Sequence, residues 1–184
     1  EETEKTNIEE IEQSQKTLGK AVGKKPKIFA YPYGETSLTI QAIIKKMGFL
    51  AAFGQHSGAF DETSDIFNLP RFSINEKYAN IKRFRLAANS IALQVSDITP
   101  TDPFLTLTNP PAIGFTIISK LKNLNQLSCF FSHTGKIRIE LLGNRRFEIR
   151  AGQPFPRGRT RLNCTLPGIN GRWHWFGQQF YRPS

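Results

Sequence analysis

The sequence is poor in cysteine, histidine and long apolar runs, and each shortage excludes a class of protein. Only two cysteines and three histidines occur in 184 residues. The cysteines have no further Cys or His nearby at zinc-ligand spacing, and His56, His133 and His174 lie far apart. We therefore predict no metal site within this chain. No run of about 18 apolar residues is present, so we expect no transmembrane segment.

Cys129 and Cys164 each lie inside a strand-like run. We predict that they form a disulfide, which would place the protein in an oxidising compartment, either the periplasm or the cell exterior. The alternative is a pair of buried free thiols.

Acidic residues are scarce in the second half of the chain. Residues 1–90 carry 13 Lys and Arg against 11 Asp and Glu, whereas residues 91–184 carry 12 against 4. The net charge of +10 therefore comes mainly from the second half, at +8. This change in net charge between the two halves predicts a separate basic module after residue 90.

The first half contains a strand, loop, helix, strand pattern. The apolar run Ile28–Tyr31 ends at Pro32, which cannot donate a hydrogen bond to a sheet. Ser37 can cap a helix whose apolar residues recur at helical spacing, namely Ile40, Ile43, Ile44 and Met47. The wholly apolar run Phe49–Phe53 is typical of a strand buried on both faces. Two such strands around a helix predict a parallel βαβ unit.

Two further helices are predicted around this unit. The first spans Asn7–Gly23, and its buried stripe would consist of Ile8, Ile11, Leu18 and Val22. The second contains Tyr78, Ile81, Arg85 and Ala88 at helical spacing. A turn-rich bridge then marks a domain boundary at about residues 89–102.

The remainder has an all-β pattern, with short runs separated by turn signals. We predict strands at Ile113–Ile118, Leu127–Phe131, Ile137–Leu142, Phe147–Arg150, Arg161–Leu166 and Trp173–Phe180. Strands of this length and spacing favour a small β-sandwich. The predicted domains are therefore 1–90 and 91–184.

The segments FAYPYGE, GFLAAFGQHSG and LPRF, in this order and spacing, resemble the second half of the polysaccharide deacetylases, the NodB-like carbohydrate esterase family. The resemblance covers roughly residues 8–84. It implies an α/β fold, as part of an irregular (β/α) barrel, with the all-β domain as an accessory. It also implies removal of acetyl groups from an N-acetylated polysaccharide by a metal-bound water.

The resemblance places substrate-binding residues on the loops that follow the two strands. Pro32 and Tyr33 match the family's proline–aromatic motif, in which the aromatic backbone N–H helps to hold the oxyanion. Glu35 is either a further substrate contact or a solvated carboxylate. His56 is either a functional residue, as a catalytic proton donor or a substrate contact, or a loop histidine that is bonded locally. The family usually has arginine where this sequence has Ala30.

The family's paired-aspartate and His-x-x-x-His motifs are absent from this sequence. A catalytic metal needs about three protein ligands. We therefore expect the divalent metal, zinc in many such sites, only in the intact family domain, and we expect this chain alone to be inactive. The simplest interpretation is the C-terminal part of a longer deacetylase.

The alternative function is a non-catalytic glycan- or polyanion-binding module. Trp173, Trp175 and Tyr181 alternate along one strand, as either a sugar-binding platform or a core. The arginines of the second half, Arg145, Arg146, Arg157, Arg159, Arg161 and Arg172, could bind an anionic glycan or form a solvated surface. No nucleic-acid-binding motif accompanies this charge, so we predict no nucleic-acid partner.

Overall fold

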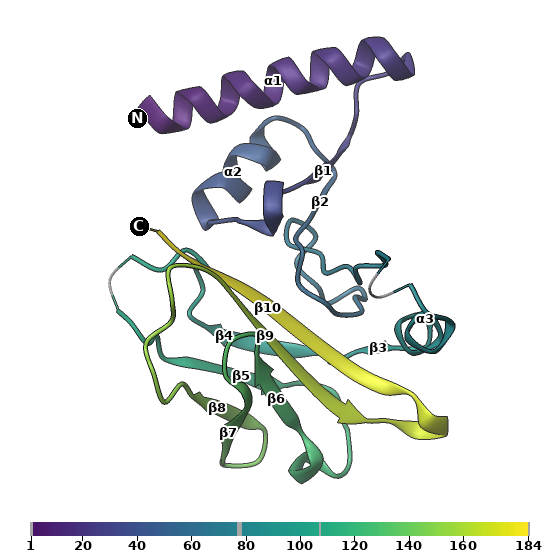
Figure 1. Cartoon of the computed structure of the whole chain (residues 1–184), viewed down its shortest axis with the longest axis vertical. Coiled ribbons are helices and arrows are strands. Elements are labelled where there is room, and N and C mark those ends of the chain that lie inside the picture. Colours follow the sequence, from purple (N-terminus) through teal and green to yellow (C-terminus); the bar gives the residue numbers. More distant parts are fainter. Residues whose placement is uncertain (1, 77–78, 107, 184) are drawn as a thin grey trace.

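The structure is a computed structural model that describes residues 2–76, 79–106 and 108–183. We call residues 1–90 the α/β region and residues 91–184 the β region. The α/β region contains α1 (Glu2–Val22), β1 (Ile28–Ala30), α2 (Leu38–Lys46), β2 (Ala51–Phe53) and α3 (Ile81–Ala88). In Figure 1, α2 and the β1–β2 sheet lie side by side between α1 and the β region.

The predicted βαβ unit is present. Strands β1 and β2 pair in parallel, with Ile28 opposite Ala51 and Ala30 opposite Phe53. The Ser37 hydroxyl accepts a hydrogen bond from the backbone N–H of Ile40 at 3.2 Å and so caps α2. The apolar stripe of α2 packs inward, as the complete burial of Ile44 shows.

The prediction for the first helix is partly wrong. Helix α1 is longer than predicted, and only Ile11 of its expected stripe is buried, while Leu18 and Val22 are 49% and 59% exposed. The reason is the size of the sheet, because two strands of three residues cannot cover the apolar stripe of a 21-residue helix, and Ile11 joins the core around β1 and β2. Helix α3 begins after the capping residue Asn80, and the predicted helical position Tyr78 lies outside the described residues.

The β region forms one eight-stranded sheet with the order β3-β10-β9-β6-β7-β8-β5-β4. Its strands are β3 (Ile91–Ala92), β4 (Val95–Thr99), β5 (Ile113–Ile117), β6 (Ser128–Phe131), β7 (Gly135–Leu142), β8 (Arg146–Arg150), β9 (Gly158–Pro167) and β10 (Trp173–Arg182). Short 3-10 turns occur at Pro32–Gly34, Leu124–Gln126 and Ile169–Gly171. All six predicted strands are present, within a few residues at each end.

The sheet curls on itself so that its two end strands, β3 and β4, come close together. These two strands follow each other directly in the chain. Strand β3 pairs in parallel with β10, and β4 pairs antiparallel with β5. Between them, the Leu93 N–H donates to the Trp175 carbonyl and the Gln94 carbonyl accepts from the Ile118 N–H. The predicted two-sheet sandwich is therefore not confirmed. The predicted linker at residues 89–102 instead contains β3 and β4, which are the two end strands of one curled sheet.

The predicted disulfide is confirmed. Cys129 on β6 and Cys164 on β9 are directly opposite each other, with their Cα atoms 4.1 Å apart, and they are bonded. Both are fully buried in a core of fifteen residues that includes Phe115, Phe155 and Phe180. Within residues 2–76, 79–106 and 108–183, no helix combines the length and hydropathy that a transmembrane span requires.

Candidate functional site at the junction of the two regions

The loop after β1 is held in a tight turn. Tyr31 is buried, and its hydroxyl donates to the Phe67 carbonyl at 2.8 Å; burial raises its pKa to about 12. Tyr33 has φ 57° and Gly34 has φ 70°, so two successive residues adopt the left-handed conformation. A Cβ at Gly34 would collide with the side chain and backbone of Gln55. The turn therefore brings the loops after β1 and β2 into contact.

Strand β10 packs against the loop after β2. A Cβ at Gly177 would overlap the carbonyl oxygen of Ser57, so only glycine permits this approach. Beside it, the ring of Phe72 meets Trp175 edge-on, with the ring centroids 5.0 Å apart. The β region thus covers the ends of β1 and β2 where the predicted site residues lie.

Tyr33 and Glu35 contact β9 and β10. The Gln179 side-chain amide donates to the Tyr33 carbonyl at 3.0 Å. Arg159 forms an ion pair with Glu35 at 3.5 Å, and its guanidinium carbon lies 5.0 Å from the centroid of the Tyr33 ring. Both predicted substrate residues are thereby held by side chains of the β region. The Tyr33 side chain is still 67% exposed.

His56 is buried beneath the same interface, with an exposed fraction of 4%. Burial, with the positive charge of Arg161 adding to it, lowers the pKa of His56 from 6.5 to about 4. The imidazole is therefore neutral at pH 7, and a neutral ring can accept a proton more readily than it can donate one. The catalytic role of His56 stays a prediction.

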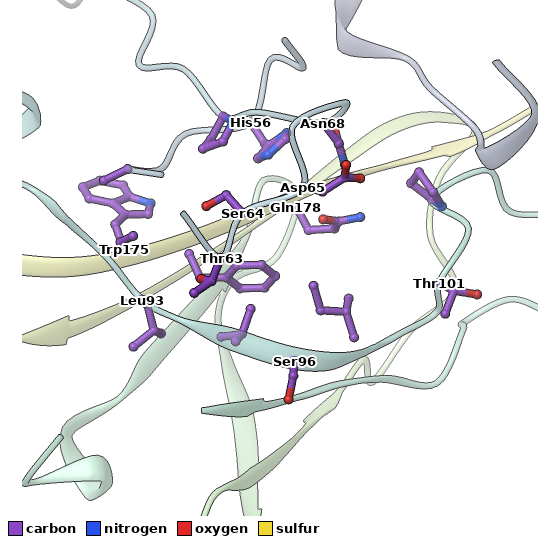
Figure 2. Close-up of a pocket in the computed structure, with 18 of the residues that line it drawn as sticks. His56, Thr63, Ser64, Asp65, Asn68, Leu93, Ser96, Thr101, Trp175 and Gln178 are labelled. Carbon is purple, nitrogen blue, oxygen red and sulfur yellow. The ribbon is translucent and has the colours of Figure 1, made fainter. Parts of the chain in front are cut away.

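A cavity of about 390 Å³ lies between the regions. Figure 2 shows its polar side chains, including His56, Asn68 and Gln178, together with Leu93 and Trp175. The segment 56–68 supplies half of the polar lining residues, and β3, β4 and β10 supply about half of the apolar ones together with Ser96, Asp97 and Gln178. The loop side of the cavity is therefore the more polar, and the strand side is the more apolar.

The predicted site residues do not share one cavity. Pro32 and Glu35 line a separate hollow of about 300 Å³ between α1, α2 and Phe104. His56 lines the larger cavity, on the other loop. The structure thus brings the two loops together through Gly34 and Gln55 but separates the side chains that sequence analysis grouped.

The described residues do not fit a catalytic metal. Within them, no three His, Cys, Asp or Glu side chains lie together as a group that could hold an ion. His133 stacks on Phe131 with the ring centroids 5.7 Å apart, and the His174 ring faces the Ala92 carbonyl at 3.4 Å. Any metal-dependent step would need ligands from outside these residues.

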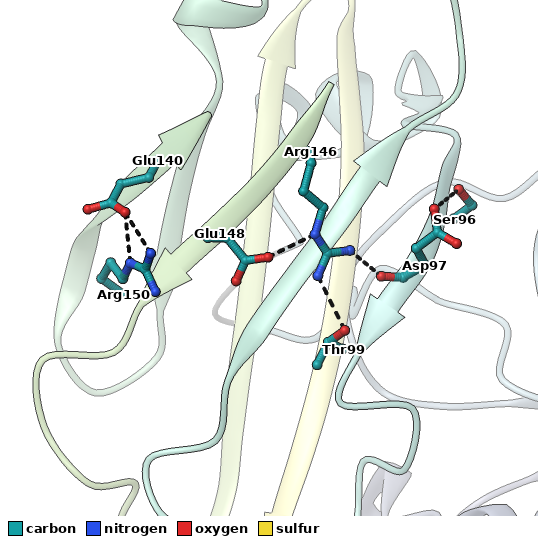
Figure 3. Close-up of polar contacts among 7 residues, drawn as sticks. All are labelled: Ser96, Asp97, Thr99, Glu140, Arg146, Glu148 and Arg150. Carbon is teal, nitrogen blue, oxygen red and sulfur yellow. Dashed lines mark hydrogen bonds and ion pairs between the residues drawn. The ribbon is translucent and has the colours of Figure 1, made fainter. Parts of the chain in front are cut away.

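The arginines of the β region are largely engaged within the protein. Figure 3 shows Arg146 bonded to Glu148 at 2.8 Å, to the Asp97 carbonyl and to Thr99, and Arg150 paired with Glu140. Arg145 donates to the Ser119 carbonyl at 2.6 Å. These contacts tie strands together, and the anionic-glycan surface stays a prediction.

Sequence analysis missed the residues of the β region that complete the junction. Arg159 and Gln179 contact the Tyr33 loop, and Gln178 lines the cavity. One signal was available: glycine inside a strand pattern, as at Gly177, indicates close approach of another backbone. That signal does not identify the approaching segment.

The comparisons with known proteins agree with the resemblance over part of the chain. The family model for polysaccharide deacetylase matches residues 1–52. No curated protein and no solved structure matches the chain significantly. The match therefore includes β1, the Pro32–Glu35 loop, α2 and the start of β2, and it suggests a deacetylase-like function that acts on a polysaccharide.

Proposed function

We propose that this chain is the C-terminal part of a metal-dependent polysaccharide deacetylase that hydrolyses N-acetyl groups of a glycan. The observation that carries the proposal is the deacetylase match over residues 1–52, which includes the Tyr31–Gly34 turn. The exposed Tyr33 at the end of a parallel strand is in the position where α/β folds place functional loops.

The metal and its ligands would come from a part of the protein that precedes these residues. We propose zinc or another divalent ion, held by a paired-aspartate motif and a His-x-x-x-His motif. The backbone N–H of Tyr33 would then help to stabilise the oxyanion of the tetrahedral intermediate. The buried disulfide supports a periplasmic or secreted location.

The alternative is a non-catalytic glycan-binding module. One observation favours it: His56 is buried under β10 and is neutral at pH 7. In this alternative the α/β region is a remnant of a catalytic domain, and the β region does the binding.

The test is acetate release from N-acetylated oligosaccharides by the intact protein, with and without a chelator. We expect zinc-dependent acetate release by the intact protein and none by the 184-residue chain. An intact protein that lacks the two upstream motifs, or that carries them but releases no acetate with any divalent metal, would contradict the proposal and favour the binding module.

A further inference from the structure

Two buried polar side chains face the cavity between the regions without a partner. His56 is 4% exposed and Gln178 is 8% exposed. Neither His56 nor Gln178 forms a side-chain hydrogen bond with any residue in the described part of the chain. Buried polar groups are nearly always hydrogen-bonded to protein, water or ligand. The cavity therefore offers donors and acceptors that a bound polar molecule can satisfy.

The charged residues at the cavity are acidic although the chain is strongly basic. Asp65 and Asp97, which are both exposed, lie at its lining, and no described Lys or Arg does. Asp65 accepts from the Phe67 backbone N–H, and Asp97 accepts from the Ser96 hydroxyl, both at 2.9 Å. Neither carboxylate is ion-paired to a described residue. The nearby cation Arg161 is bonded to Gln55 and Gln179 instead. This charge distribution disfavours an anionic ligand and favours a cationic one.

The strand side of the cavity is mostly apolar, and Gln178 is its buried polar residue. Leu93 and Phe176 lie there, and Trp175 adds an aromatic ring. The Trp175 N–H already donates to Asn163 at 3.2 Å, which fixes the ring. Hydroxyl-binding groups beside an aromatic and aliphatic surface suit a sugar ring, which has polar edges and apolar faces. The volume of about 390 Å³ lies within the range of small-molecule sites.

We propose that this cavity binds a hexosamine unit whose amino group is free and protonated. Gln178 and His56 would bond the sugar hydroxyls, Trp175 would pack against the ring, and Asp65 would pair with the ammonium group. The choice of an amino sugar rests on the proposed function, because deacetylation produces this group. The cavity would then retain the modified glycan rather than the acetylated substrate.

The test is a fluorescence titration of the Trp173→Phe variant, in which Trp175 is the one remaining tryptophan. Three probes are compared: a glucosamine disaccharide, its fully N-acetylated form, and a glucose disaccharide of the same linkage. We expect the glucosamine probe to bind roughly tenfold more tightly than the other two at low salt. Added salt should reduce this preference, since it screens partly exposed charges.

Matched variants separate the carboxylate effect from folding. Asp65→Asn should lower the preference for glucosamine about threefold to fivefold. Glu62→Gln changes an acid of the same loop outside the cavity and should leave the preference unchanged. Gln178→Leu should weaken the binding of every probe, with its fold checked by near-ultraviolet circular dichroism.

Equal or tighter binding of the acetylated probe, or no binding of any probe, would overturn the inference. An intact protein that releases acetate but shows no amino-sugar binding would retain the proposed function and overturn this site. An intact protein that binds the amino sugar but releases no acetate would retain this site and overturn the proposed function.

Discussion

The α/β region and the β region bury very different amounts of apolar side chain. Fifteen buried residues form the core of the β region, and five form the core around β1 and β2. Twelve large apolar side chains are exposed before residue 91 and six after it. The β region therefore has a core of its own, whereas the α/β region depends on contacts with other parts of the protein.

One such contact is the junction with β9 and β10. A second contact would be at the outer edge of β1, where the described residues supply no partner strand. The junction joins the two loops to β9 and β10 through Gln179, Arg159 and Gly177. The outer edge of β1 pairs with no described strand, and Ile28 at this edge is 61% exposed. An open edge beside apolar surface can pair with a further strand. In the proposed function, the preceding part of a deacetylase domain would cover it.

Removal of the disulfide should have the largest effect, and it should be confined to the β region. Replacement of Cys129 and Cys164 by alanine releases a loop closed over 35 residues. We expect a loss of about 4 kcal/mol in the free energy of unfolding, measured by urea denaturation. An unchanged urea midpoint would show that the core of the β region does not need this link.

Acid should weaken the junction through His56. Its pKa is about 4 in the folded protein, compared with the ordinary histidine value of 6.5 that applies when the chain unfolds. The unfolded chain therefore binds more protons between these values, and stability falls as the pH drops from about 6.5 to about 4. The full loss is about 3 kcal/mol. Urea unfolding at several pH values measures it.

Two histidine variants provide the control for this pH dependence. His56→Gln should flatten the dependence between pH 6.5 and 4. His133→Gln changes an exposed histidine and should leave it intact. A His56→Gln protein with the wild-type pH profile would show that His56 is not buried as described.

A methyl group at Gly177 should separate the regions. Gly177→Ala would collide with the Ser57 carbonyl, and overpacking of this kind costs about 2 kcal/mol. Faster hydrogen exchange at residues 54–58 would report the displacement. The control is Gly152→Ala, where the added carbon meets no atom within 4 Å. Equal behaviour of both variants would argue against close packing at Gly177.

The ion pair at the junction should matter least. Arg159 and Glu35 have side chains that are 40% and 31% exposed, so solvent screens their attraction. Arg159→Gln should lower the free energy of unfolding by less than about 1 kcal/mol. Arg157→Gln serves as the exposed control. A loss of several kcal/mol would mean that the contact with Glu35 and Tyr33 organises the junction.

Local patterns predicted most of the secondary structure because they depend on neighbouring residues. The Ser37 cap, the stripe of α2 and the alternation of β9 and β10 are properties of short segments. The disulfide of Cys129 with Cys164 was predicted because each cysteine lies in a strand-like run, and the two residues are directly opposite each other on β6 and β9.

The remaining features depend on long-range pairing that local patterns do not encode. Residues 91–99 contain turn-forming residues, yet they pair with β10 and β5 because these two ends of the sheet meet there. Likewise, the family resemblance grouped Pro32, Glu35 and His56 as site residues. In the folded chain, Pro32 and Glu35 line one hollow and His56 lines another.

The most direct test of the central claim is hydrogen exchange of residues 1–90 alone against the same residues in the whole chain. The claim is that β9 and β10 hold the loops after β1 and β2 in place. In the whole chain, the N–H of Arg71 bonded to His56 and the N–H of Gly54 bonded to Leu69 should be protected. In residues 1–90 alone we expect both to exchange at nearly the unfolded rate. Equal protection in the two samples would contradict the claim and show that the α/β region folds without the β region.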